Sequence, residues 1–245
     1  MTDNDRVIAV VDYGVGNLAS VLKAFAAVGA EATLVRDPAR LAEAAAIVLP
    51  GVGNFGHCSR EFHRYGFAGP LRAARKRRVP ILGICVGMQL LFEGSEEDAA
   101  EPGLGFYCGS VTKLTGVARV PQIGWNAIDL VGTHPWLREV RGGDHFYFVH
   151  SYAAETDDDV VLGTVDYGGP RLAIVGSEAL LGVQFHPEKS GANGLRLLRA
   201  FAAAAAATTD ATTGAATTGA DTTGAASPAS AATGAAAPVA RGSGR

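Results

Sequence analysis

Short apolar runs alternate with helix-like segments along the first 92 residues, and this order limits the possible folds more than any other feature of the sequence. The expected strands are 6–12, 31–36, 46–49 and 81–84. The expected helices are 18–28, 38–45, 61–77 and 86–92. In the first of these helices, apolar side chains recur at helical spacing on one face. A βαβα order of this kind predicts a parallel sheet with helices on both faces.

The pattern changes after residue 105, where strand signals follow one another without long helices between them. These signals lie at 109–114, 126–131, 145–152, 160–166, 172–176 and 181–184. We interpret them as antiparallel strands that extend the sheet, and a last helix is expected at 194–201. The fold class is therefore α/β with three layers: a mainly parallel central sheet, helices on both faces, and antiparallel strands at the C-terminal side.

The chain has 245 residues, of which 48% are hydrophobic, and this suits one globular domain with a large core. Composition changes sharply after about residue 205, because the rest is mostly Ala, Thr and Gly with a little Ser and Pro. A repeated TTGA pattern gives no amphipathic face there. We therefore expect a domain at 1–205 and a disordered tail at 206–245, with a segment that folds on a partner as the alternative.

Charge and cysteine content argue against several classes of protein. The net charge of −3 disfavours nucleic acid as a partner, because phosphate binding needs a basic excess. The basic run at 72–78 is interpreted as a solvated helix face rather than an anion site. Three irregularly spaced cysteines form neither a disulfide framework nor a zinc motif. Because the sequence shows no signal peptide and no apolar stretch of membrane-spanning length, the expected location is the cytoplasm.

A cysteine lies where the strand at 81–84 meets the next helix. Cys85 stands between Gly83 and Gly87 in the sequence GICVG, the thiol version of a nucleophile elbow. Such a turn is too tight for side chains at the glycines, and the backbone of the nucleophile is usually strained. The helix N-terminus would stabilise a thiolate, and the N–H of Val86 would face the oxygen of an attacked carbonyl. The alternative is a buried structural cysteine.

A histidine and a glutamate two residues apart follow the strand at 181–184. In an extended segment, His186 and Glu188 lie on the same side, and Pro187 favours an extended conformation at His186. A carboxylate that orients an imidazole is the general-base arrangement of triad enzymes. The alternative is an ordinary ion pair at the end of a strand.

A glycine-rich loop follows the strand at 46–49. Gly51 and Gly53 flank Val52, so a peptide there can rotate at low cost and present either an N–H or a carbonyl. Loops after parallel strands gather at one edge of the sheet, so this loop could supply a second oxyanion donor. A plain glycine turn is the alternative. Neither this loop nor the segment at 12–17 has a phosphate-loop or dinucleotide pattern.

With these segments, the chain resembles the class I (triad) glutamine amidotransferases over residues 6 to about 201. More narrowly, it resembles the subfamily of glutaminase subunits of imidazole glycerol phosphate synthases. The segments that carry the resemblance are DYGVGNLASV (12–21), PGVGNFGHC (50–58), GICVGMQLLFEGSEE (83–97), PQIGWN (121–126), FYFVHSY (146–152) and GVQFHPEKS (182–190).

The resemblance implies a role for each matching residue. The catalytic triad would be Cys85, His186 and Glu188. The oxyanion would be bound by Gly51, Val52, Gly53 and the N–H of Val86. The glutamine-binding positions would be Gln89, Glu97, Ser151 and Tyr152. The positions near a partner interface would be Asn17, Trp125, Tyr147 and Lys189.

The resemblance also implies the reaction and the partner. Glutamine would be hydrolysed to glutamate and ammonia through a cysteine thioester, with no metal or organic cofactor. A cyclase subunit with a (β/α)8 barrel would receive the ammonia through a channel. It would make imidazole glycerol phosphate and aminoimidazole carboxamide ribonucleotide in histidine biosynthesis. Val86 replaces a commoner Leu, and Gln122 and Ile123 replace a commoner His-Met pair, but none of these side chains carries catalytic chemistry.

Three other functions are weighed against this one. The first is the same chemistry for a different ammonia acceptor, which the sequence leaves open. The second is a cysteine hydrolase or chaperone-like protein on a similar sheet, although such proteins lack the His-Pro-Glu segment. The third is a non-catalytic scaffold, and the intact triad argues against it.

Overall fold

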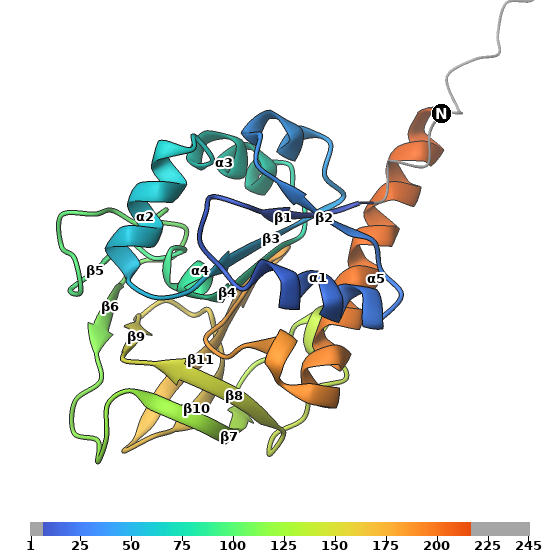
Figure 1. Ribbon diagram of the computed structural model, residues 1–245. Helices are drawn as coiled ribbons and strands as arrows, with labels where there is room; N and C mark the ends of the chain where they lie inside the picture. Colours follow the sequence, from blue (N-terminus) through green and yellow to red (C-terminus); the bar gives the residue numbers. More distant parts are fainter. Residues whose placement is uncertain (1–6, 217–245) are drawn as a thin grey trace, which may run out of the picture.

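The computed structural model describes residues 7–216 and contains a nine-stranded sheet with the strand order β2-β1-β3-β4-β12-β11-β10-β7-β8. Figure 1 shows this sheet with helices on either side of it. The architecture is the three-layer α/β fold that the sequence predicts. Residues 217–245, most of the expected tail, lie outside the described part of the chain.

The first five strands of the order run parallel to one another. They are β2 (Ala32–Val35), β1 (Ile8–Val11), β3 (Ala46–Gly51), β4 (Ile81–Cys85) and β12 (Leu180–Val183). Their residues are apolar because the inner strands are covered on both faces. Since these strands are parallel, the loops after β3, β4 and β12 open at the same edge of the sheet.

The remaining four strands are antiparallel to their neighbours and extend the sheet, as predicted. They are β11 (Pro170–Ser177), β10 (Val161–Asp166), β7 (Gln122–Leu130) and β8 (His145–His150). One expectation was wrong: β12 is parallel to β4, and only its other neighbour, β11, is antiparallel to it. A run of strand signals does not reveal that the last strand inserts beside β4.

A second, three-stranded sheet was not expected. It consists of β5 (Gly94–Ser95), β6 (Ser110–Lys113) and β9 (Tyr152–Glu155). The strand expected at 109–114 belongs to this sheet and not to the central one. The strand expected at 145–152 ends at His150, and β9 then begins at Tyr152 and pairs with β6. Ser151 therefore lies at the point where the chain passes from one sheet to the other.

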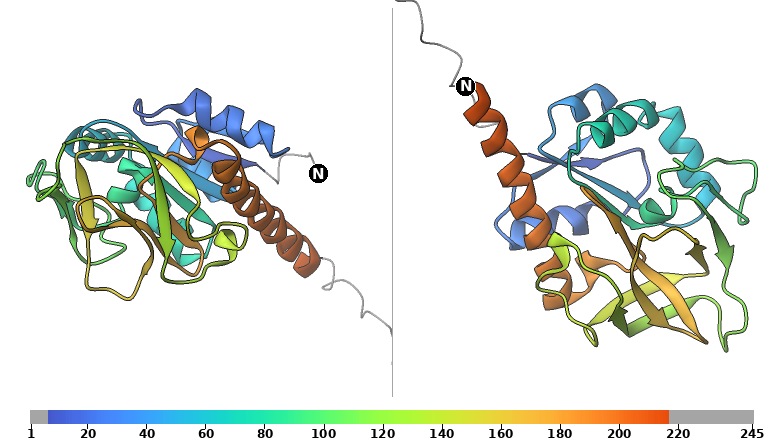
Figure 2. Two further views of the ribbon diagram at one scale, coloured as in Figure 1. Left: turned by 90° about the horizontal axis from the view of Figure 1, so that it is seen from below. Right: turned by 180° about the vertical axis from the view of Figure 1, so that it is seen from behind.

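The helices cover the two faces of the sheet. The α-helices are α1 (Leu18–Ala27), α2 (Phe55–Arg64), α3 (Ala68–Lys76), α4 (Val86–Gln89) and α5 (Gly191–Ala216). Three short 3₁₀ helices are η1 (Pro38–Ala42), η2 (Pro135–Leu137) and η3 (Pro187–Lys189). α1 and α5 pack together, and α2, α3 and α4 lie on the opposite face (Figures 1 and 2). The connection from β1 to β2 and the connection from β3 to β4 run in opposite directions along the sheet. Since such connections are right-handed, their helices lie on opposite faces.

Three expected helices differ from the structure. The helix expected at 61–77 is two helices, because Gly66 has a φ of +80° and breaks the path between α2 and α3. α2 begins earlier than expected, where the side chain of Asn54 accepts a hydrogen bond from the N–H of His57 at 2.8 Å. The helix expected at 86–92 ends at Gln89, and the one expected at 38–45 is the 3₁₀ helix η1.

The C-terminal helix is longer than expected. α5 runs from Gly191 to Ala216 and so passes the domain boundary predicted at 205. Alanine has the highest helix propensity, so an Ala-rich segment readily continues a helix that has already formed. The domain boundary at 205 and the tail at 206–245 stay predictions, because residues 217–245 lie outside the described part of the chain. Among residues 7–216, no helix is both long enough and apolar enough to span a membrane.

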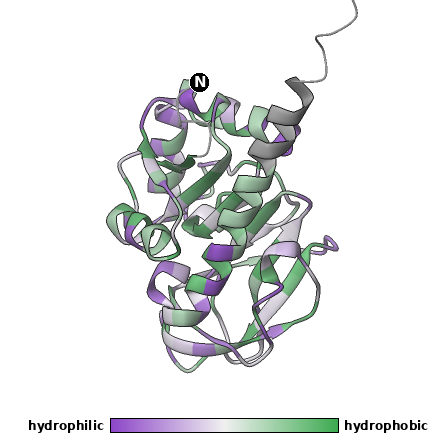
Figure 3. Ribbon diagram, turned by 90° about the vertical axis from the view of Figure 1, so that its right-hand side faces the viewer, coloured by the Kyte–Doolittle hydropathy of each residue, from purple (hydrophilic) through white to green (hydrophobic). Residues whose placement is uncertain are grey.

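The core surrounds the central strands. In Figure 3 the strands are predominantly apolar, while the outer surfaces of the helices mix apolar and polar residues. Stacked aromatic rings of Phe146 and Phe185, with centroids 4.1 Å apart, join β8 to the segment after β12. This contact fixes the antiparallel half of the sheet against the residues that precede His186.

Candidate active site

Cys85 occupies a strained turn between β4 and α4. Its φ of +55° and ψ of −114° are rare for a residue with a side chain. Strain of this kind costs of order 1–3 kcal/mol and persists only where the surrounding structure enforces it. Cys85 is 3% exposed, so the turn presents its thiol to a small space at the edge of the sheet rather than to open solvent.

Two glycines make this turn possible, as expected. A Cβ atom at Gly83 would lie 2.8 Å from the carbonyl oxygen of Gly87. A Cβ atom at Gly87 would lie 1.8 Å from the carbonyl oxygen of Leu49, which is inside any permitted contact distance. The backbones of β3 and α4 therefore approach so closely that only glycine fits at residue 87.

His186 and Glu188 form a buried pair. The Nδ1 atom of His186 lies 2.8 Å from Oε1 of Glu188, and their side chains are 2% and 1% exposed. His186 is extended, with φ −101° and ψ 95°, whereas Glu188 lies in the 3₁₀ helix η3. The two side chains thus meet across a turn rather than along one straight strand. The carboxylate fixes the ring so that Nε2 is left for other chemistry.

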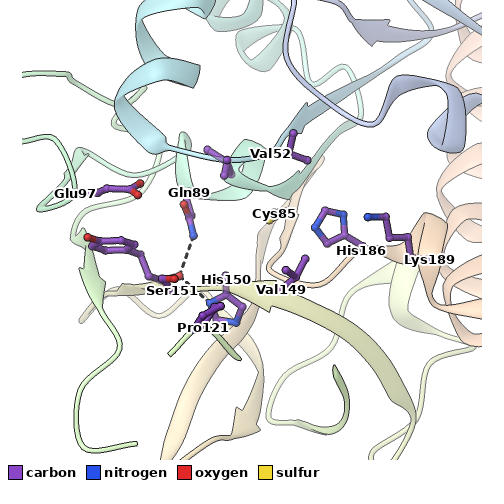
Figure 4. A pocket seen from close by; sticks show the side chains of 13 residues that line it. Val52, Cys85, Gln89, Glu97, Pro121, Val149, His150, Ser151, His186 and Lys189 are labelled. Carbon is purple, nitrogen blue, oxygen red and sulfur yellow. Dashed lines mark hydrogen bonds between the residues drawn. The ribbon is translucent and has the colours of Figure 1, made fainter. Parts of the chain in front are cut away.

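Figure 4 shows the ring of His186 beside Cys85, and both residues line the same cavity. Burial disfavours the charged ring, but hydrogen bonds and charge interactions with Cys85 and Glu188 outweigh burial and raise the pKa of His186 to about 10. An imidazole held between a sulfur and a carboxylate can carry a proton at neutral pH and pass it on.

Cys85 and His186, two members of the expected triad, face a cavity of about 330 Å³. All four expected glutamine-binding residues line the same cavity. The lining residues are Val52, Gly53, Cys85, Val86, Gln89, Glu97, Pro121, Val149, His150, Ser151, Tyr152, His186 and Lys189. A cavity of this size and partly polar lining suits a small polar molecule of amino-acid size.

Side chains around the cavity are fixed by hydrogen bonds. Nε2 of Gln89 donates to the carbonyl of Tyr152 at 3.0 Å and to Oε1 of Gln184 at 3.1 Å. Nε2 of Gln184 in turn lies 3.8 Å from the sulfur of Cys85. Glu97 accepts a hydrogen bond of 2.7 Å from the N–H of Phe55 at the start of α2. The cavity wall is therefore connected both to Cys85 and to the start of α2, the helix after the glycine loop.

The register of the sheet determines how the glycine loop is oriented. The N–H of Ile47 donates to the carbonyl of Pro80 at 2.8 Å, so the odd-numbered residues of β3 direct their backbone groups toward β4. Gly51 is paired with Cys85 in this register, and its carbonyl therefore faces β4. In a trans peptide, the N–H of Val52 points the opposite way, so it faces away from Cys85. Gly53, with φ +87°, then turns the chain into α2.

Three of the four expected interface residues form one cluster. Trp125 and Tyr147 are paired across β7 and β8, with ring centroids 6.1 Å apart, and Trp125 is 51% exposed. The ammonium of Lys189 lies 5.9 Å from the centre of the Tyr147 ring. Asn17 precedes α1, and no hydrogen bond or ring contact among the described residues joins it to this cluster.

Two polar residues of the site were missed by the sequence reasoning. Gln184 is two residues before His186, and this alternation could have placed both on one side of the chain. His150 lines the cavity and is held by its Nδ1, which lies 2.8 Å from the carbonyl of Tyr152. Burial lowers the pKa of His150 to about 4, so its ring is neutral at physiological pH.

Comparisons with known proteins show which family the chain belongs to. The family model for "glutamine amidotransferase class-I" matches residues 9–205. The imidazole glycerol phosphate synthase subunit HisH of Salinibacter ruber is 46% identical over 202 residues, which cover 79% of this chain and 93% of the relative. The subunit of the same name from Thermococcus kodakarensis is 46% identical over 200 residues, which cover 80% of this chain and 98% of the relative.

Solved structures share the fold at lower identity. A crystal structure of a glutamine amidotransferase aligns with a TM-score of 0.65 and 22% identity, covering 81% of this chain and 98% of that one. A chain of the PurLQS structure from Thermotoga maritima aligns with a TM-score of 0.63 and 22% identity, covering 80% of this chain and 97% of that one. On the family match and the similar relatives, this chain belongs to the class-I glutamine amidotransferase family.

Proposed function

We propose that this protein is the glutaminase subunit of an imidazole glycerol phosphate synthase, with Cys85 as nucleophile. The observation that carries the proposal is the convergence of the strained Cys85, the His186–Glu188 pair and a glutamine-sized cavity at one edge of the sheet. The relatives that bear this name are 41–46% identical to the chain. We also propose that the protein is located in the cytoplasm and that its partner is a cyclase subunit.

The reaction begins when glutamine enters with its side-chain amide beside Cys85. The thiolate attacks the amide carbon, and the tetrahedral oxyanion is held by backbone N–H groups of Val86 and of the loop 51–53. His186 gives a proton to the departing nitrogen, so ammonia leaves and a γ-glutamyl thioester remains on Cys85. His186 then takes a proton from water, which hydrolyses the thioester and releases glutamate.

The glutamine-binding roles follow from the lining of the cavity. Glu97 is the one carboxylate among the described lining residues and would attract the α-ammonium of glutamine. Gln89, Ser151 and Tyr152 would position the rest of the amino acid. No cofactor is needed in this scheme, because the attack, the proton transfers and the charge stabilisation all use groups of the chain.

The partner would dock where the exposed Trp125 and Lys189 and the half-buried Tyr147 lie, with Asn17 as a fourth contact. Lys189 belongs both to this cluster and to the cavity lining, so the docking surface adjoins the site of ammonia release. A short enclosed path is useful, because free ammonia becomes ammonium in neutral water and ceases to be a nucleophile. The Val52 N–H faces away from Cys85, so we also propose that partner binding improves the oxyanion geometry.

The test measures glutamate release by the full chain, alone and with the cyclase subunit and its nucleotide ligand. The proposal predicts slow release alone, much faster release in the complex, and none from Cys85→Ala in either state. Absence of glutamate release from the assembled complex would refute the proposed function. Full turnover without the partner would refute the activation but leave the glutaminase in place.

A further inference from the structure

Two buried side chains that take no part in the proposed chemistry lie beneath the glycine loop. Tyr13 follows β1 and Cys58 is in α2, and both are fully buried. Neither lines the cavity. Their polar atoms therefore do not contact a substrate in the cavity, and they form hydrogen bonds within the protein instead.

Each of these side chains donates a hydrogen bond to a carbonyl of the loop. The hydroxyl of Tyr13 donates to the carbonyl of Pro50 at 2.6 Å. The thiol of Cys58 donates to the carbonyl of Val52 at 3.3 Å. The two carbonyls flank the Gly51–Val52 peptide, which is the peptide whose N–H would have to face an oxyanion.

Both side chains keep their protons and therefore remain donors. Burial raises the pKa of Cys58 to about 11, and burial also raises the pKa of Tyr13 well above its ordinary value. At neutral pH neither group ionises, so the two hydrogen bonds persist over the working range of the enzyme.

The conformation that these bonds hold is the one in which the Val52 N–H faces away from Cys85. To turn that N–H toward the nucleophile, the Gly51–Val52 peptide must rotate by about half a turn. Among residues 7–216, the non-glycine residues with positive φ are Arg78, Cys85 and Glu178, so Val52 has a negative φ. With both neighbouring peptides fixed, the rotation would force Val52 to a positive φ, which is costly for a β-branched residue.

We propose that Tyr13 and Cys58 form a clamp that holds residues 50–53 in this resting orientation and are positioning residues for the glutaminase reaction. The inference rests on the proposed function. When the hydrogen bond to the carbonyl of Pro50 or of Val52 is lost, the neighbouring peptide can move. The rotation is then shared among several backbone angles and no longer changes φ of Val52 alone. The clamp thereby keeps turnover low until docking of the partner supplies the energy to open it.

The measurable consequence is higher basal activity when a clamp donor is removed. Cys58→Ala leaves the carbonyl of Val52 without its donor in the resting state, and a neutral hydrogen bond in a protein corresponds to roughly a two- to tenfold change in an equilibrium. We expect kcat of the isolated chain to rise about two- to tenfold. KM for glutamine should change by less than about twofold, because the cavity lining is untouched.

The experiment compares Cys58→Ala, Cys58→Ser and Tyr13→Phe with wild type, alone and in the complex. Cys108→Ala serves as the matched control, because Cys108 is an exposed cysteine outside the site. Serine keeps a donor at residue 58, so Cys58→Ser should reverse most of the increase that alanine causes. In the complex, all variants should approach the wild-type rate, so the activation ratio falls for Cys58→Ala and Tyr13→Phe.

The outcomes separate this inference from the proposed function. Thermal denaturation identifies any variant that fails to fold, and Tyr13→Phe then carries the test in place of Cys58→Ala. Basal kcat equal to or below wild type in a folded donor-deleting variant would overturn the clamp. If the wild-type complex is active, that result leaves the glutaminase assignment standing; if the complex is inactive, the proposed function itself fails.

Discussion

The buried pair of His186 and Glu188 allows a quantitative prediction for Glu188→Gln. The substitution keeps the size of the side chain but removes its charge. The Oε1 atom of Glu188 is 2.8 Å from Nδ1 of His186, and the pair is almost fully buried. A hydrogen bond to a charged group is worth about 1.5–3 kcal/mol. If this energy stabilises the imidazolium in the transition state, kcat should fall by roughly 10- to 150-fold.

The other oxygen of Glu188 predicts a second effect. Oε2 is buried and has no hydrogen-bond partner. In the glutamine variant, the amide oxygen can take the place of Oε1, which leaves the new NH₂ group at the Oε2 position without an acceptor. An unsatisfied buried polar group costs about 1–3 kcal/mol, so the variant should also lose stability by this order.

The assay measures steady-state glutamate release over a range of pH, together with thermal unfolding. Glu178→Gln is the control, because it makes the same chemical change at an exposed ion pair with Arg78. KM should stay within about threefold of wild type, since Glu188 does not line the cavity. A Glu188→Gln variant with wild-type kcat would refute the view that this carboxylate supports the charged ring.

Other predictions concern single residues of the site and the surface. Gly87→Ala should abolish activity and lower the midpoint of thermal unfolding, because its Cβ would lie 1.8 Å from the Leu49 carbonyl oxygen; activity near wild type would contradict the elbow geometry. Burial lowers the pKa of His150 in the folded state to about 4, whereas its unfolded-state pKa is about 6.5. The neutral ring therefore contributes fully to stability above about pH 6.5, and this contribution is lost as the pH falls toward 4. His150→Gln should therefore show a smaller loss of thermal stability between pH 7 and 4, and an unchanged pH dependence would count against this. The pKa of His186 is raised in the folded state, so its effect on stability has the opposite pH dependence. The charged ring stabilises the fold fully below about pH 6.5, and this stabilisation is lost as the pH rises through about 10. His186→Gln should therefore reduce the fall in unfolding temperature at alkaline pH. Trp125→Ala should weaken binding to the cyclase subunit in calorimetry and leave the unfolding temperature nearly unchanged, because the side chain is half exposed; unaltered binding would remove this residue from the interface.

The sequence was most informative where local spacing determines geometry. The elbow around Cys85 follows from a strand, two glycines and a helix in immediate succession, and the structure has the strain and close contacts that this order requires. His186 and Glu188 are two residues apart, so their meeting also depends on local conformation. Alternation of strand and helix signals likewise predicted the parallel pairing of β1 to β4, but not that of β12.

The features that the sequence did not reveal depend on contacts between distant segments. The insertion of β12 beside β4 brings Gln184 to Cys85, and no periodicity in either segment indicates this pairing. The clamp of Tyr13 and Cys58 likewise joins the end of β1, the loop after β3 and α2. The break at Gly66 and the extension of α5 show that helix limits depend on single glycines and on helix propensity.

The identity of the nucleophile is the central claim, and covalent labelling tests it most directly. The full chain, in complex with the cyclase subunit, is treated with the glutamine analogue 6-diazo-5-oxo-norleucine, and the labelled peptides are mapped by mass spectrometry. The account predicts one adduct, on Cys85, with loss of glutaminase activity in proportion to labelling and protection by glutamine. Stoichiometric inactivation with the label on Cys58 or Cys108, and Cys85 unmodified, would contradict it.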